Sequence, residues 1–406
     1  MQLNIIAFAV PLFLSLMGLE YYYSRRKGRE VYHFQDFITN ISIGVGERLA
    51  DLFTTGIFFF VFQYIYEHWR IFTLEAGWWQ WLVLFIFTDF IWYWYHRLGH
   101  EVNILWAAHV VHHQSEDFNY SVSARITVFQ SLARGVFWCL LPLLGFAPSA
   151  TFVMLLIHGA YPFFTHTQLI GRLGFLEYFL VTPSHHRVHH SSNPEYLDKN
   201  YGDVLIIWDK LFGTFVAEQQ EPVYGLTSPL KSHSFLWQHF HFPLELLVAF
   251  RRASTAQARI KVLFGKPDDI DAGIRPYLEK ILLRKSRVQI LTPVLRRYVT
   301  IQTIVLLLVL FGTLLFEQYL SGMHLFFLSA LIVLTVILSG AMLEQKNWVF
   351  ELECTRLVIF AAYVLQAIGD SQWTIFFLVV SSLFSLVYPP LRKEYNRMLF
   401  RDIPVS

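Results

Sequence analysis

The sequence predicts an all-α, polytopic membrane protein with about nine spans. Of its 406 residues, 55% are hydrophobic and only 15% are charged, whereas a soluble domain carries roughly 25% charged residues. Runs of apolar residues recur along the chain, and each is near the ~20 residues that a helix needs to cross the hydrocarbon layer. Lys and Arg gather between alternate runs, as the positive-inside rule describes for multi-pass proteins.

Orientation follows from the basic residues. With the N-terminus outside, only Arg70 lies in a loop on the non-cytosolic side. An even number of spans would place the basic residues of 390–406 outside, which the rule disfavours. The predicted spans are 3–20, 49–66, 79–95, 126–147, 149–166, 298–318, 324–343, 351–368 and 373–389.

Two regions are expected. Residues 1–297 hold five spans and a polar segment, 167–297, which we expect to form a cytosolic cap; residues 298–406 consist mainly of spans that pack or face lipid. A net charge of +2 without a basic stripe excludes a nucleic-acid partner. Cys139 and Cys354 are far apart in apolar surroundings, so neither a disulfide framework nor a thiolate metal site is predicted.

Histidine is the most unevenly distributed residue type. Nine of the 17 histidines lie within 96–113 and 185–190. The segment HRLGH places its two imidazoles one helical turn apart, and the segments HVVHH and HRVHH space theirs at i, i+3 and i+4, which predicts one helix face for each group. Thr182 followed by Pro183 is typical of an N-cap and first turn, so a helix is expected to begin there.

These imidazoles indicate a metal centre. Neutral imidazole binds iron, copper, zinc and nickel, and eight or nine of them exceed what one ion can use. Two metals with positions open for dioxygen fit the number, whereas a closed zinc site takes four ligands. The predicted ligands are His96, His100, His109, His112, His113, His186, His189 and His190, with His166 as a ninth and His185 as either a ligand or a donor to one.

Other polar residues in the apolar runs are also interpreted. Asp89 precedes the first motif by two turns; a carboxylate at that depth is costly without a partner, so we expect it to fix the tautomer of a ligand histidine, the alternative being a pair with an unrelated residue. Glu101 is a candidate beside the metals or a solvated group. Arg134 either snorkels or meets an anionic group, and His158 is expected to be a core histidine. The histidines without an expected role at the metals are His33, His68, His233, His239, His241 and His324, of which His239 and His241 are candidates for an entrance lining.

The motif series HxxxH, HxxHH, HxxHH in a multi-pass protein resembles the fatty acid hydroxylase and sterol desaturase superfamily, and within it the alkylglycerol monooxygenase branch. Segments 95–125, 165–215 and 223–229 carry the resemblance. The resemblance implies two iron ions held by the eight motif histidines, with Glu101 matching a glutamate needed for activity. It also implies a dioxygen-dependent reaction on a membrane lipid: tetrahydrobiopterin supplies electrons, and hydroxylation beside an ether oxygen releases a fatty aldehyde and a glycerol derivative.

Alternatives remain open on substrate and electron donor. The sequence contains no fused cytochrome b5 and no ferredoxin-like cysteines, so the reductant is expected to be a diffusible pterin or a separate electron-transfer protein. A fatty acyl, ornithine lipid or sterol hydroxylase or desaturase fed by a protein donor is the second interpretation. A metal carrier is the third, although its polar residues would be spread along the spans. The expected location is a bacterial inner membrane or the endoplasmic reticulum, with the site facing the cytosol.

Overall fold

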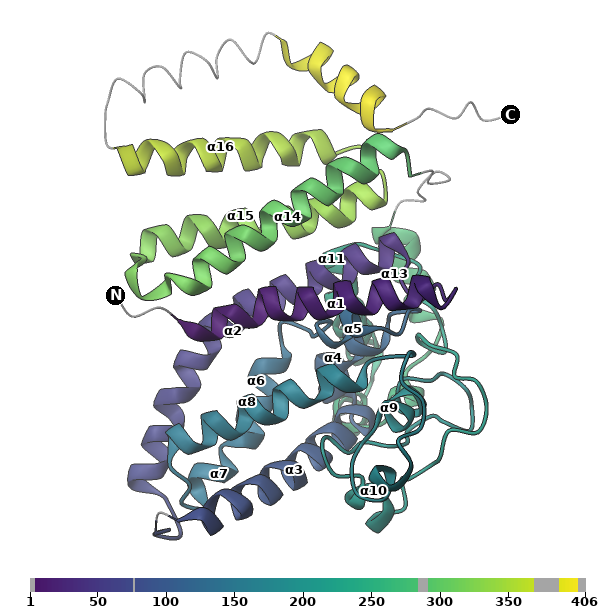
Figure 1. Cartoon of the computed structure of the whole chain (residues 1–406). Coiled ribbons are helices and arrows are strands. Elements are labelled where there is room, and N and C mark those ends of the chain that lie inside the picture. Colours follow the sequence, from purple (N-terminus) through teal and green to yellow (C-terminus); the bar gives the residue numbers. More distant parts are fainter. Residues whose placement is uncertain (1–3, 76, 284–290, 369–386, 401–406) are drawn as a thin grey trace. The chain divides into compact units, whose positions relative to one another are not determined.

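The computed structural model of the chain describes residues 4–75, 77–283, 291–368 and 387–400 (Figure 1). These residues are mainly helical and contain no named β-strand; their extended pairings are two isolated bridges, Leu180 with Leu205 and Ser191 with Tyr224. The predicted all-α class is therefore confirmed. The chain divides into two compact units.

The larger unit comprises residues 14–231 and 238–282 and carries all the histidine motifs. Most of α1 (Ala9–Arg26) and α11 (Phe235–Arg252) also belongs to it. Its remaining helices are α2 (Phe34–His68), α3 (Trp78–Glu101), α4 (Asn103–His109), η2 (Val110–His113), α5 (Tyr120–Ser123), α6 (Gln130–Trp138), α7 (Leu140–Leu143), α8 (Pro148–Thr165), η3 (Gly174–Tyr178), α9 (Pro183–His189), α10 (Ile207–Leu211), α12 (Ala256–Phe264), η4 (Pro267–Asp269) and α13 (Ile274–Leu282).

The smaller unit draws on residues 1–13, 232–237 and 283–406. Its buried Glu353 accepts hydrogen bonds from the Tyr298 hydroxyl and, at 2.6 Å, from the Gln302 amide, so its carboxylate is held between α14 and α16. The helices of this unit are η1 (Ile5–Phe8), α14 (Pro293–Leu315), η5 (Glu317–Tyr319), α15 (Gly322–Leu343) and α16 (Val349–Ile368).

An apolar core joins α2, α3, α6, α7 and α8 of the larger unit. Gly135 on α6 permits close packing there, because a Cβ at that position would lie 2.2 Å from the ring of Phe58. Burying such side chains contributes about 25 cal/mol per Å² of apolar surface. The buried core residues are Phe62, Leu84, Ile91, Trp138, Leu141, Phe146 and Met154.

The predicted number of spans is not confirmed. Four stretches in the described residues are helical, long and apolar enough to cross a membrane: Ile5–Arg26, Phe34–His68, Pro293–Leu315 and Gly322–Leu343. Helices do form where spans were predicted at 79–95, 149–166 and 351–368, but α3, α8 and α16 fall outside that set. The span predicted at 373–389 lies largely outside the described residues.

The stretch predicted as a span at 126–147 forms two short helices, α6 and α7, that meet at Cys139, and its crossing of the membrane remains a prediction. Proline lacks an N–H and its ring crowds the carbonyl four residues earlier, so Pro142 in α7 leaves the Trp138 carbonyl without its usual helical donor, and regular helix is interrupted at Cys139. Apolar side chains of the stretch fill the core described above. Hydropathy alone does not distinguish an interrupted helix from a continuous one.

Helix α2 is longer than predicted. Its 35 residues correspond to about 52 Å at 1.5 Å per residue, so the predicted span 49–66 covers only its second half. The first half buries Asn40, Ser42 and Glu47. Glu47 lies 3.4 Å from the guanidinium of Arg134, which resolves the role of Arg134 in favour of an anionic partner.

Candidate metal centre

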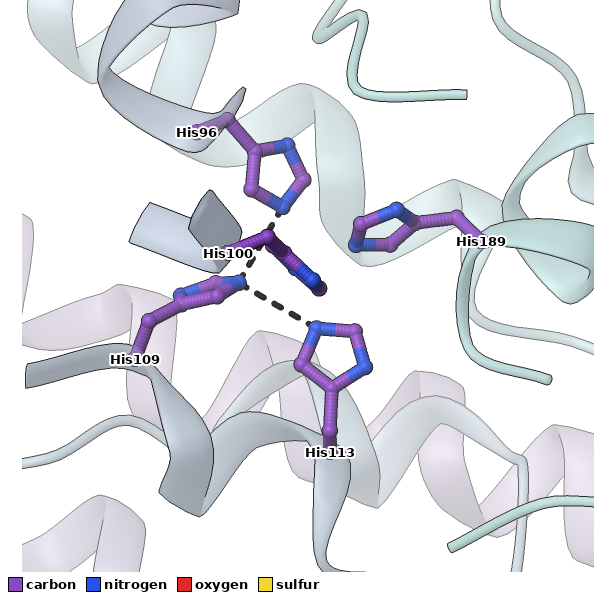
Figure 2. Close-up of side chains that lie close together, drawn as sticks. All are labelled: His96, His100, His109, His113 and His189. Carbon is purple, nitrogen blue, oxygen red and sulfur yellow. Dashed lines mark hydrogen bonds between the residues drawn. The ribbon is translucent and has the colours of Figure 1, made fainter. Parts of the chain in front are cut away.

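Nine imidazoles meet in the larger unit as two adjacent clusters. The five-histidine cluster joins α3, α4, η2 and α9, and Figure 2 shows its rings turned toward one another. Within each cluster the candidate ligand nitrogens all lie within 4.8 Å of one another, and every one of these residues is 9% exposed or less. The five-histidine cluster is His96, His100, His109, His113 and His189; the four-histidine cluster is His112, His166, His186 and His190.

Each HxxHH motif supplies both clusters. His109 and His113 belong to the five-histidine cluster, but His112 belongs to the other. The motif of α9 does the reverse, because only its middle histidine, His189, joins the five-histidine cluster. Each motif therefore divides its histidines between the two clusters, an assignment that the sequence analysis left open. In the first motif the α-helix gives way after His109 to a 3₁₀ turn, which rotates successive residues by a larger angle than an α-helix does.

Helix α9 begins at Pro183 with Thr182 as its N-cap, as predicted. The ring of His185 caps the N-terminus of this helix, because its Nδ1 accepts a hydrogen bond from the Thr182 N–H at 3.4 Å. His185 lies in neither cluster. The structure thus brings nine of the ten candidate histidines together and leaves His185 outside.

Backbone carbonyls fix the tautomers of four rings. A carbonyl oxygen only accepts, so each facing Nδ1 carries the proton and each Nε2 keeps a lone pair in the neutral imidazole. These carbonyls belong to loop residues or helix ends that the histidine pattern does not reveal. The Nδ1 to oxygen pairs are His96 to Tyr201 (2.8 Å), His189 to Lys199 (3.0 Å), His112 to Arg125 (3.1 Å) and His166 to Pro162 (2.6 Å).

The inner nitrogens fit a metal ion in each cluster. Nε2 of His166 lies 3.2 Å from Nε2 of His112, and both carry lone pairs because their Nδ1 atoms donate to carbonyls. Two such lone pairs repel unless a cation lies between them. Ligands at right angles, each at about 2.1 Å from a metal as imidazole is in zinc sites, would place neighbouring nitrogens about 3.0 Å apart. In the five-histidine cluster, Nε2 of His96 lies 3.1 Å from Nε2 of His109.

Burial keeps these rings neutral. Desolvation is the largest effect, followed chiefly by repulsion from neighbouring imidazoles, and together they hold each pKa well below the ordinary histidine value. The neutral form is the one that coordinates metals. The rings with this lowered pKa are His109, His112, His113, His186, His189 and His190.

Asp89 does not contact a ring of either cluster, so the predicted role in fixing a ligand tautomer is wrong. Its fully buried carboxylate accepts the N–H groups of Val204 (2.9 Å) and Leu205 (3.2 Å) and the indole N–H of Trp208 (2.8 Å). The carboxylate thus anchors the cap segment to α3. Carbonyls supply the contacts to ligand rings that Asp89 was expected to provide.

His158 is a buried core histidine, as expected. Its Nδ1 lies 2.7 Å from a carboxylate oxygen of Asp203 and 3.7 Å from Asp89. Glu101 lies outside both clusters and pairs with Arg97 at 3.0 Å, with its side chain 32% exposed. The role that the resemblance gives Glu101 therefore remains a prediction.

The sequence interpretation missed two polar residues beside the clusters. Asp198 places a carboxylate oxygen 3.6 Å from Nδ1 of His100. Arg125 is 2% exposed, and its guanidinium donates to the carbonyl of Val111 and to the side chains of Asn40, Gln114 and Gln238. An arginine at the edge of an apolar run was the available signal.

The remaining histidines lie outside the two clusters. His239 and His241 are fully buried, and Nδ1 of His241 lies 3.4 Å from the Gln114 amide. The ring of His33 lies 2.5 Å from Asp117, and that of His68 lies 2.9 Å from the carbonyl of Tyr64.

The fold and site define the class of histidine-rich membrane hydroxylases, since the profile of the fatty acid hydroxylase family matches residues 81–214, which include both clusters. Alkylglycerol monooxygenase of Danio rerio is 35% identical over 363 residues, or 86% of this chain and 80% of that protein. The chain belongs to the alkylglycerol monooxygenase family.

Other relatives extend the comparison. Alkylglycerol monooxygenase of Homo sapiens is 42% identical over 264 residues, which are 64% of this chain and 58% of the human protein. The chain thus matches somewhat over half of the human protein's length. Ornithine lipid hydroxylase OlsE of Rhizobium tropici is 35% identical over 135 residues, or 32% of this chain and 40% of that protein. No solved structure matches the chain.

Proposed function

We propose that the protein is a membrane-bound di-iron monooxygenase that oxidises the alkyl chain of an ether lipid. The observation that carries the proposal is the pair of buried clusters of neutral imidazoles in a chain of the alkylglycerol monooxygenase family. In the reaction that the family resemblance implies, hydroxylation beside the ether oxygen would give a hemiacetal that collapses to a fatty aldehyde and a glycerol derivative.

The donor set suits iron that must keep a position open. Imidazole binds iron well, and an alkyl C–H bond is too strong for side-chain acid–base chemistry, so bound iron with dioxygen would supply the oxidation. His96, His100, His109, His113 and His189 would hold one ion and His112, His166, His186 and His190 the other. Glu101 is proposed to act near this centre, and Asp89 to keep the cap segment in place.

The protein's own task is to orient the lipid and exclude water. Both clusters are buried, and α2 and α3 present large exposed apolar side chains, among them Phe60, Trp78 and Leu82, as lipid-facing helices do. We propose that the alkyl tail enters from the bilayer while the polar end of the lipid stays at the cytosolic boundary. The depth of the ether carbon would then decide which position is oxidised.

One experiment tests substrate and electron donor together. Purified iron-loaded protein in lipid nanodiscs is given an alkylglycerol, dioxygen and tetrahydrobiopterin, and fatty aldehyde is measured. Aldehyde is expected only when the pterin and the ether lipid are both present. Absence of aldehyde in a protein that holds two irons would contradict the ether-lipid proposal.

The match to an ornithine lipid hydroxylase favours one second candidate. In that case the clusters and the iron stay the same, but the substrate is an acyl chain and a protein supplies the electrons. The same iron-loaded protein, given ornithine lipid and a reduced ferredoxin or cytochrome, would yield a hydroxylated acyl chain and no aldehyde.

A further inference from the structure

One peptide bond lies between a buried carboxylate and a ring of the five-histidine cluster. The carbonyl of Tyr201 accepts from Nδ1 of His96 at 2.8 Å, and the N–H of Gly202, which belongs to the same peptide unit, donates to Oδ2 of Asp209 at 2.7 Å. A trans peptide is planar, with its C=O and N–H pointing in opposite directions. A carboxylate that holds the N–H therefore aims the carbonyl at the imidazole.

We infer that Asp209 is a positioning residue that fixes His96 across the Tyr201–Gly202 peptide, and that it supports only the five-histidine cluster. The inference rests on the proposed function insofar as both clusters bind metal. The arrangement resembles the carboxylate–histidine–metal triads of zinc sites, with a peptide group inserted between carboxylate and ring. Hydrogen bonds in such a chain strengthen one another by polarisation.

The carboxylate of Asp209 accepts three hydrogen bonds. It is fully buried, and besides the N–H of Gly202 it accepts the N–H of Tyr201 and the hydroxyl of Thr214, each at 2.7 Å. All three partners are donors to the carboxylate. An asparagine of the same size would keep one acceptor atom and turn an NH₂ group toward one of these donors.

Glycine at 202 is required by the same contact. A Cβ there would lie 2.9 Å from Oδ2 of Asp209 and 2.7 Å from the carbonyl oxygen of Leu205. The carbonyl of Leu205 belongs to the backbone, so it cannot move aside as the end of a flexible side chain can. A side chain at position 202 would therefore push the peptide away from Asp209.

A second ligand of the same cluster is held in a related way. The carbonyl of Lys199 accepts from Nδ1 of His189 at 3.0 Å, and the Asn200 N–H on the same peptide donates to the carbonyl of Thr214 at 3.1 Å. The Thr214 N–H in turn donates to the carbonyl of Asp209 at 2.8 Å. The rings of the four-histidine cluster that have carbonyl partners use Arg125 and Pro162 instead, so Asp209 does not hold them.

The test compares iron release from the two clusters in the full-length protein. Wild type and Asp209→Asn are loaded with ferrous iron without dioxygen, and release to an excess of chelator is followed over time. We expect one of the two irons to leave Asp209→Asn about 10- to 100-fold faster than wild type, the range for residues that orient metal ligands, and the other to leave at the wild-type rate. Wild-type release of both irons, or equal acceleration of both, would overturn the inference.

Two further variants separate positioning from a general loss of structure. Thr214→Val removes a different hydrogen bond to the same carboxylate and keeps both backbone contacts, so its iron release should match wild type; selective loss of one iron there as in Asp209→Asn would contradict the inference. In a His96→Ala background, Asp209→Asn should leave the release of the remaining iron unchanged, because Asp209 supports only the five-histidine cluster. Faster release of that iron would show that Asp209 acts by another route.

Folding and metal binding are checked separately. If Asp209→Asn does not yield folded protein, Gly202→Ala is tested in its place. We expect the same faster release of one of the two irons. Release of both irons at the wild-type rate would contradict the inference. A wild type that binds no iron would instead refute the proposed function.

Discussion

At the scale of single residues, the hydrogen bond made by Nδ1 of an imidazole determines whether its Nε2 has a lone pair for a metal. Carbonyls bind Nδ1 of His96, His112, His166 and His189, which leaves a lone pair on each Nε2. Histidine spacing predicted eight of the nine imidazoles that converge, whereas His166 was inferred from its place at the end of a predicted span and His185 lies in neither cluster. The spacing could not predict their partners, because a backbone carbonyl has no signature in the sequence.

Ligand substitutions should remove one iron at a time. His109→Ala is expected to empty the five-histidine cluster and His190→Ala the four-histidine cluster, each lowering bound iron from about two per chain to about one and reducing turnover below detection. Iron is measured by mass spectrometry and turnover by aldehyde release. His68→Ala is the control, since its ring lies outside both clusters and contacts the Tyr64 carbonyl. Retention of two irons by His109→Ala would contradict the assignment.

Asp89→Asn should lower stability while leaving the protein folded and inserted. The carboxylate accepts three N–H donors, and an amide would leave a buried donor unsatisfied at a cost of about 1–3 kcal/mol. Thermal unfolding in detergent measures the change. Because the cap segment carries the Tyr201 and Lys199 carbonyls, turnover is expected to fall as well. An unchanged melting temperature would contradict this anchoring role.

At the scale of elements, short pieces of helix bring the ligands together and a buried arginine ties the pieces. Arg125 joins α2 through Asn40, η2 through Val111 and α11 through Gln238. The helix start at Thr182 and Pro183 was predictable from capping preferences. The break within 126–147 was signalled by Pro142 but outweighed by hydropathy, and the 3₁₀ turn that divides HVVHH depends on tertiary packing.

Arg125→Lys should destabilise the larger unit by about 3 kcal/mol or more. A lysine carries three donors on one nitrogen and cannot reproduce the guanidinium fork, so at least two hydrogen bonds of a charged group are lost at about 1.5–3 kcal/mol each. The melting temperature in detergent reports the effect. Arg252→Lys is the matched control, because that side chain is 53% exposed in its ion pair with Asp271. Equal stability of both variants would contradict the role of Arg125.

At the scale of the whole molecule, the helical class follows from composition, but the number of spans does not. Apolar stretches build an internal core as well as lipid-facing helices, as the residues from Trp138 to Phe146 show. Hydropathy predicts only that a side chain is removed from water, and it does not distinguish burial in a protein core from contact with lipid. The division into a histidine-bearing unit and a smaller helical unit likewise depends on packing between segments that are distant in the sequence.

Acid should destabilise the metal-free protein. The six imidazoles with lowered pKa stay neutral in the folded chain but take up protons once unfolded, with an ordinary pKa of about 6.5. The free energy of unfolding should therefore be insensitive to these groups above pH ~6.5 and fall below it, by up to about 1.4 kcal/mol per pH unit for each ring. Melting temperatures between pH 8 and pH 5 test this. A flat profile across that range would contradict it.

Because α9 contributes histidines to both clusters, it constrains the distance between them. One seven-residue helix with its C-cap residue carries His189 of one cluster and His186 and His190 of the other, so helical pitch and side chains of fixed length would set the distance between two bound ions. A shift of α9 would carry ligands of both ions in the same direction. The distance between two bound metals should therefore stay the same when other helices of the unit move. Two sites carried by separate helices would instead move apart.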